Sequence, residues 1–76
     1  MNETRRKSLR EAVSRLERVT SSVESICDAE EEAMENCPEN LQMSERYAAM
    51  EHAVDSMHDA IEKLDEAKEL IESAIS

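Results

Sequence analysis

The 76-residue sequence contains no glycine, no tryptophan and no phenylalanine, and Tyr47 is its only aromatic residue. Nucleotide-binding loops need glycines so that the backbone can approach phosphate, and compact β folds need turn glycines and β-branched or aromatic strands. A single tyrosine cannot build the aromatic platform on which single-stranded nucleic acid stacks. The absences therefore argue against phosphate-binding loops, β architectures and stacking nucleic-acid binders.

Long apolar runs are also missing. No run exceeds a few residues, whereas a bilayer-spanning helix needs roughly 18–20. The basic residues near the start are followed by no apolar stretch, so we expect no secretory signal and a cytoplasmic location. Cys27 and Cys37 are about 15 Å apart along a helix, too far for a disulfide, and they show no zinc-finger spacing. We expect two reduced thiols.

The residues that are present favour helix, with one break. Ala, Glu, Leu, Met, Arg and Lys dominate the chain, and these are strong helix formers. Pro38 disfavours helical conformation in the residue before it and lacks a backbone donor. Ser44 is a suitable N-cap for a second helix, with Met43 as the apolar residue that packs on its first turns; a start with Pro38 in the first helical position is the alternative. The sequence predicts one all-α domain, with a helix over about 3–36, a turn over 37–43 and a helix over about 44–75.

Apolar residues recur at heptad spacing in both predicted helices. Three heptad columns are apolar in each helix, the width typical of a helix in a bundle. In the first helix, column a holds Leu9, Leu16, Val23, Glu30 and Cys37, column d holds Ala12, Val19, Ile26 and Ala33, and column e holds Val13, Thr20, Cys27 and Met34. In the second helix, column a holds Tyr47, Val54, Ile61, Lys68 and Ile75, column d holds Met43, Met50, Met57, Leu64 and Ile71, and column g holds Ala53, Ala60, Ala67 and Ala74.

These columns predict an antiparallel, coiled-coil-like hairpin whose a and d columns form the core. With a turn centred near Asn40, residues whose numbers sum to about 80 lie level, and the basic N-terminal residues lie beside acids of the second helix. Column e of the first helix and the alanine column then fall on opposite edges and stay wet. Because such a core is thin, we expect a homodimeric four-helix bundle, or docking onto a partner helix. The self-association core candidates are Val13, Val19, Ile26, Met50, Val54, Met57, Ile61, Leu64 and Ile71.

His58 is the residue that most suggests a metal site. It shares a helix face with Asp55, Asp59 and Glu62, and carboxylate–x–x–His is the pattern of di-metal bundle sites. Those sites need ligands inside the bundle, but Asp55 and Glu62 occupy outward positions, so we expect a solvated face without metal or cofactor. His52 is expected to be exposed. No Ser, Thr or Cys has a base in a recognisable pattern, so we expect no enzyme.

The charge is acidic and uneven. The formal net charge is −10, and seven acids with no base lie between Glu24 and Glu39. Such a surface repels nucleic acid and anionic membranes and attracts basic partners. Regular carboxylates on a rod can imitate duplex phosphates, whereas the plainer interpretation is solubility. The partner-binding candidates are Glu24, Asp28, Glu31, Glu32, Glu35, Glu39, Arg46, Asp55, Asp59 and Glu62, with the turn residues 39–46 as an exposed recognition segment.

The second half of the chain carries a resemblance. The stretches Pro38–Gln42 and Ser44–Tyr47, followed by Met50, Glu51 and Ala53, resemble a pattern in small acidic uncharacterised helical proteins of bacteriophages and mobile elements of Gram-positive bacteria. The resemblance implies a helical hairpin of accessory phage or plasmid origin and transfers no catalytic residues. We expect a non-enzymatic protein that binds itself or another protein; the alternative is a nucleic-acid mimic that inhibits a basic nucleic-acid-binding protein.

Overall fold

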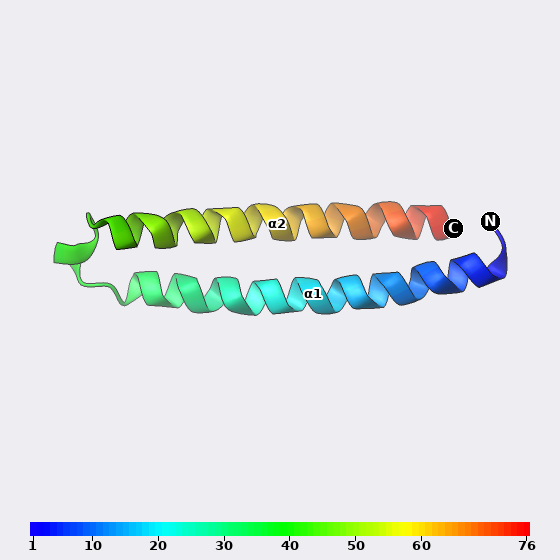
Figure 1. Cartoon of the computed structure of the whole chain (residues 1–76), viewed down its shortest axis with the longest axis horizontal. Coiled ribbons are helices and arrows are strands. Elements are labelled where there is room, and N and C mark those ends of the chain that lie inside the picture. The colour runs from blue at the N-terminus through cyan, green and yellow to red at the C-terminus, as the bar shows by residue number, and fades with distance from the viewer.

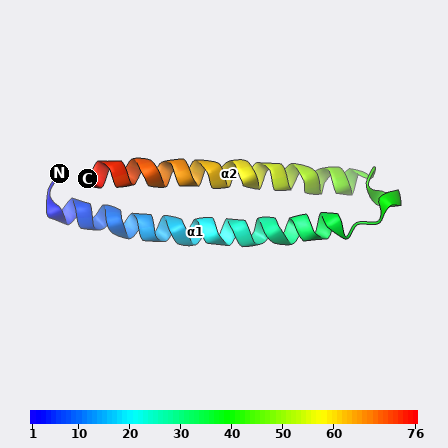
Figure 2. The ribbon, with the colours of Figure 1, turned by 180° about the vertical axis from the view of Figure 1, so that it is seen from behind.

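The computed structural model describes residues 1–76 as two long helices joined by a short connection. Helix α1 spans Glu3–Glu35, a 3-10 turn (η1) spans Glu39–Leu41, and helix α2 spans Glu45–Ile75. The helices lie antiparallel and side by side (Figures 1 and 2), in a rod whose Cα extents are 59 × 14 × 13 Å. The predicted all-α class and the two long helices are confirmed. Neither helix has a segment long and apolar enough to cross a membrane.

Side-chain caps define where both helices begin. The Asn2 side chain accepts a hydrogen bond from the backbone N–H of Arg5 at 2.8 Å, and the Ser44 hydroxyl accepts one from the backbone N–H of Tyr47 at 3.2 Å. Each bond satisfies an N–H that has no partner within its helix. Met43, expected to pack on the first turns of α2, is instead 96% exposed. That prediction is wrong: Ala48, the residue of the first turns on which Met43 was to pack, is itself exposed and gives the methionine no apolar surface to cover.

The register of the hairpin differs from the expected one. In the cross-helix contacts Glu17–Lys68 and Cys27–His58 the residue numbers sum to 85, and in Glu31–His58 they sum to 89, rather than to about 80. The connection through η1 is not symmetric, so α2 begins beyond the end of α1, and α1 extends past α2 at the open end of the rod (Figure 1). A displacement of five residues is not a whole heptad, so it brings a different column of α1 to face α2.

The seam between the helices uses columns a and e of α1, not a and d. Val13, Thr20 and Cys27 of column e are buried, whereas Val19 and Ile26 of column d are 49% and 61% exposed. The prediction that column d forms the core and that column e is solvent-exposed is therefore wrong. On α2 columns a and d do face the seam: Val54 is buried, and its half-buried neighbours are Met50, Met57, Ile61, Leu64 and Ile71.

This seam places two apolar columns on one edge of the hairpin. In an antiparallel pair, the column that flanks the seam on one helix lies beside the corresponding column of the other helix. Column d of α1 now flanks the seam on the side of the α2 alanine column, contrary to the expectation of opposite edges. Four level pairs result, each with residue numbers that sum to 86. We call them the apolar edge: Ala12 with Ala74, Val19 with Ala67, Ile26 with Ala60, and Ala33 with Ala53.

The other side of the seam is charged. We call it the charged edge, and its residues are Arg10, Glu17, Glu24 and Glu31 of α1 with Glu51, His58, Asp65 and Glu72 of α2. Lys68 leaves the core column to reach this edge, where its Nζ lies 3.4 Å from Glu17 Oε1 and 4.0 Å from Glu72 Oε1.

The basic residues at the start of α1 do not pair with acids of α2 as expected. Arg6 and Arg10 instead contact Glu3 of their own helix, at 3.5 and 3.3 Å. The reason is again the register, which carries the first residues of α1 beyond the end of α2 (Figure 1).

Candidate functional site

The apolar edge is a long uncharged surface of the rod. Its eight positions are alanine, valine or isoleucine, and none is fully buried. At 1.5 Å per residue, the stretch from Ala12 to Ala33 is about 30 Å long. The next positions in the same two columns are Arg5 at the open end and Arg46 at the turn end. The hairpin therefore presents a continuous apolar strip with a guanidinium beyond each end.

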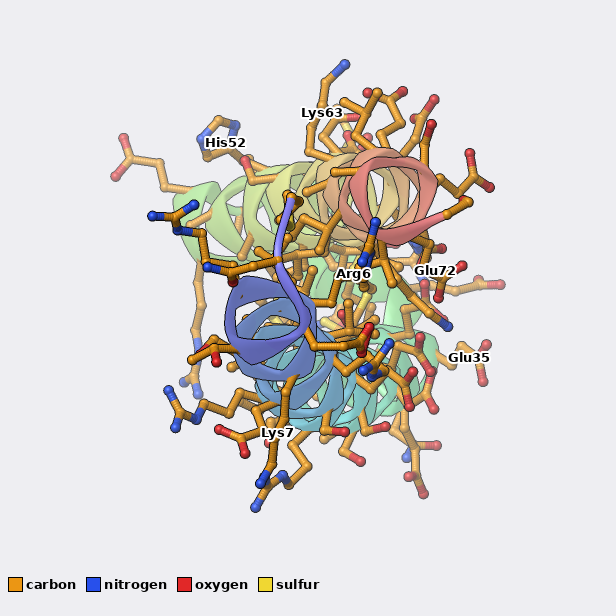
Figure 3. The ribbon with its side chains drawn as sticks, turned by 90° about the vertical axis from the view of Figure 1, so that its right-hand side faces the viewer. Arg6, Lys7, Glu35, His52, Lys63 and Glu72 are labelled. Atoms are coloured by element: carbon orange, nitrogen blue, oxygen red, sulfur yellow. The ribbon has the colours of Figure 1, made fainter.

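The acidic candidates lie over the outward faces of both helices. All of them except Glu31 are exposed, as is Arg46. They do not belong to one element: Glu24, Asp28, Glu31, Glu32 and Glu35 lie on α1, Glu39 lies on η1, and Asp55, Asp59 and Glu62 lie on α2. In Figure 3 Glu35 projects sideways from the rod, while His52 and Lys63 point away from α2. The exposure expected for His52 is observed. The structure thus gives an acidic coat on two faces rather than a single acidic site.

A hollow of about 420 Å³ lies at the turn end. The recognition segment 39–46 contributes to it, and the nearby Leu41 and Met43 are 49% and 96% exposed. Ala33 connects the hollow to the apolar edge. The other lining residues are Cys37, Pro38, Leu41, Ser44, Arg46, Tyr47 and Met50.

Three chemically different side chains converge in the middle of the charged edge. Cys27 Sγ lies 3.7 Å from His58 Nε2 and 3.9 Å from Glu31 Oε1. His58 Nε2 also donates a hydrogen bond to the same Glu31 oxygen. The three donor atoms all lie within 4.8 Å of one another. We call this group the Cys–Glu–His cluster.

The three members of the Cys–Glu–His cluster differ in how deeply they are buried. Cys27 is only 1% exposed, whereas the side chains of His58 and Glu31 are 57% and 38% exposed. Burial raises the pKa of the Cys27 thiol, and the charges of Glu31 and Asp28 raise it further. Without a cation beside it, this thiol is therefore protonated and a poor nucleophile.

The cluster does not have the geometry of a catalytic triad. A triad needs the nucleophile on one imidazole nitrogen and the carboxylate on the other. Here Cys27 and Glu31 both contact Nε2 of His58, and the thiol is shielded from any substrate. The arrangement therefore suits the binding of one ligand by all three side chains better than it suits nucleophilic catalysis.

Sequence reasoning missed this cluster for an identifiable reason. His58 was compared with acids on its own helix face and with acids in the core columns of the first helix, and Glu31 belongs to neither group. Asp55, Asp59 and Glu62 are exposed and do not join the cluster. The available signal was Cys27 and Glu31 at i, i+4 spacing, which places both on one face of a helix.

Comparisons with models of known protein families, with curated proteins and with solved structures find no match for this chain.

Proposed function

We propose that this chain is a non-enzymatic protein-binding protein that works as a homodimeric four-helix bundle, in which the apolar edges of two copies pack together. The observation that carries the proposal is the apolar edge itself. Eight consecutive edge positions carry no charge in a chain of which 37% is charged. Exposed continuous apolar strips mark interaction surfaces.

The thin core of the hairpin supports a second copy as the occupant. Only Val13, Thr20, Cys27 and Val54 are buried among 76 residues. Chains of this size rarely reach useful stability from one small core, and oligomerisation is a common solution. A second hairpin on the apolar edge covers Val19 and Ile26, the two large hydrophobic residues of the α1 heptad columns that are exposed.

The charge distribution favours antiparallel docking of the two hairpins, with the open end of one copy beside the turn end of the other. The open end, residues 1–18 and 67–76, holds seven basic and five acidic residues, a net of +2. The remaining residues 19–66 hold two basic and fourteen acidic residues, a net of −12. Antiparallel docking brings the basic end of each copy near the acidic turn end of the other, whereas parallel docking opposes like charges.

The segment 39–46 lies beyond the apolar edge and is not part of this dimer contact. Its exposed Leu41 and Met43 suit a contact with another protein. Together with the resemblance to phage and mobile-element proteins, this supports a cytoplasmic accessory protein that acts through protein–protein contacts.

A second candidate function rests on the acidic coat. Exposed carboxylates cover both outward faces of a rod about 59 Å long. A basic nucleic-acid-binding protein would be attracted to such a rod electrostatically, and the chain would then inhibit it as a nucleic-acid mimic. In this case binding weakens steeply with salt and is lost when Glu24, Asp28 and Glu32 are changed to amides. Binding to such a protein that does not change with salt concentration would contradict this second candidate function.

Sedimentation equilibrium of three matched proteins tests the homodimer. The wild type and Ser25→Glu, an exposed position next to Ile26, are expected to be dimers at tens of micromolar. Ile26→Glu adds the same charge inside the apolar edge and is expected to be monomeric with its helix content retained. A wild type that stays monomeric at millimolar concentration, or an Ile26→Glu protein that stays dimeric, contradicts the proposal.

A further inference from the structure

We propose that the Cys–Glu–His cluster is a binding site for a divalent transition metal ion of the zinc type, with one coordination position open. Cys27 Sγ, Glu31 Oε1 and His58 Nε2 supply the three ligand atoms. Two come from successive turns of α1 and one comes from α2, so the ion would link the helices at the middle of the seam.

The separations of the donor atoms suit tetrahedral coordination. Zinc bond lengths of about 2.0–2.3 Å place tetrahedral ligand atoms about 3.3–3.6 Å apart. Cys27 Sγ is 3.7 Å from His58 Nε2 and 3.9 Å from Glu31 Oε1. The hydrogen bond between His58 and Glu31 has to open to admit the ion. Both side chains are partly exposed and can make this small adjustment without disturbing the seam.

The donor set identifies the class of metal. A thiolate, an imidazole and a carboxylate together suit zinc and similar first-row ions, whereas magnesium and calcium prefer oxygen ligands alone. The surplus of acidic groups on the chain draws cations to the surface. Three protein ligands leave the fourth position to water, the pattern of an open rather than a closed zinc site.

Binding changes the protonation of two ligands. The Cys27 S–H bond breaks, a sulfur–metal bond forms, and the proton leaves to solvent. His58 binds through Nε2, so the proton now shared with Glu31 moves to Nδ1 by way of water. No oxidation or reduction occurs, because the ion keeps its charge and the thiol becomes a thiolate.

The site lies on the charged edge, across the seam from the apolar edge. A second copy on the apolar edge leaves it open to solvent, so metal binding and dimerisation are independent. The Ile26→Glu protein is therefore expected to bind metal as the wild type does, which separates a failure of this inference from a failure of the homodimer.

Titration of the reduced full chain with cobalt(II), and competition by zinc(II), tests the site. The wild type is expected to bind one cobalt ion per chain with a thiolate-to-cobalt charge-transfer band that zinc removes. Cys27→Ala is expected to abolish the band. His58→Gln and Glu31→Gln are expected to lower the affinity at least tenfold.

The chain offers matched controls. Cys37→Ala and His52→Gln remove the other thiol and the other imidazole, and both proteins are expected to keep the band and the affinity. Because Cys27 is buried, its replacement could unfold the chain, and far-UV circular dichroism checks that Cys27→Ala is still helical. If Cys27→Ala is unfolded, the variant at the exposed His58, His58→Gln, is used in its place. Absence of the band in the wild type, or its loss in Cys37→Ala rather than Cys27→Ala, overturns the inference.

Discussion

Two valines on α1 give a quantitative test of the seam. Val13 is 8% exposed and Val19 is 49% exposed, and each can be replaced by alanine. Heptad columns that pair a with d place Val19 in the core and leave Val13 wet, whereas the structure has the reverse. The two substitutions are chemically identical, so their difference in unfolding free energy reports burial alone.

The magnitude follows from the exposed fractions. Removing two carbon groups from a fully buried valine costs about 1.6 kcal/mol. Scaled by burial, the cost is about 1.5 kcal/mol at Val13 and about 0.8 kcal/mol at Val19. The higher helix propensity of alanine offsets up to about 0.6 kcal/mol at each site. Val13→Ala is therefore expected to destabilise the hairpin by about 0.9 kcal/mol and Val19→Ala by about 0.2 kcal/mol.

Urea unfolding followed by circular dichroism measures the difference. The chain is diluted until the midpoint no longer depends on concentration, so that only the monomeric hairpin is observed. With a slope of about 1 kcal/mol per molar urea, the midpoints of the two variants are expected to differ by about 0.7 M. The reasoning is refuted if Val19→Ala lowers the midpoint as much as Val13→Ala does. At high concentration the cost of Val19→Ala is expected to rise as the dimer covers this residue.

Four further substitutions test local features. Thr20→Val is expected to stabilise the hairpin by about 0.5–1 kcal/mol and so to raise its melting temperature. The buried hydroxyl donates only to the Leu16 carbonyl, at 2.9 Å, and a methyl group packs better in the seam. A lower melting temperature contradicts this. Ser44→Ala is expected to cost about 1 kcal/mol in urea unfolding through loss of the α2 cap, and an unchanged midpoint contradicts it. Met43→Ser is expected to change stability by less than about 0.5 kcal/mol because Met43 is 96% exposed, whereas Met50→Ser in the seam costs more.

Local features of this fold can be predicted from the sequence. The helix composition, the break at Pro38, the Ser44 cap and the a and d columns of α2 all depend on residues close together in the chain. Capping and periodicity act within one or two turns, so no knowledge of tertiary contacts is needed.

The register could not be predicted in the same way, because it depends on the conformation of the connection. Three apolar columns on α1 allow two seams, and column d, with Val19 and Ile26, is more apolar than column e, with Thr20 and Cys27. Hydrophobicity alone therefore selects the wrong column. The Cys–Glu–His cluster was missed for the same reason, since it exists only in the observed register.

The exposed column has a meaning in the proposed dimer. Helix α1 buries Thr20 and Cys27 within the hairpin and exposes the more apolar Val19 and Ile26. We therefore expect Val19 and Ile26 to contact a second molecule. Packing of two apolar edges accounts for this distribution, with the charged edge left for solvent and metal. The two proposals thus divide the rod between its two edges.

The most direct test of this account is an isotope-filtered NOE experiment on dimers formed from equal amounts of ¹³C-labelled and unlabelled chains. The account predicts intermolecular contacts from the methyl groups of Val19 and Ile26, and from the alanines of α2 column g, to the apolar edge of the other copy. It predicts no intermolecular contact at His58 on the charged edge. Intermolecular contacts centred on His58, or none from Ile26 in a sample that sediments as a dimer, would contradict it.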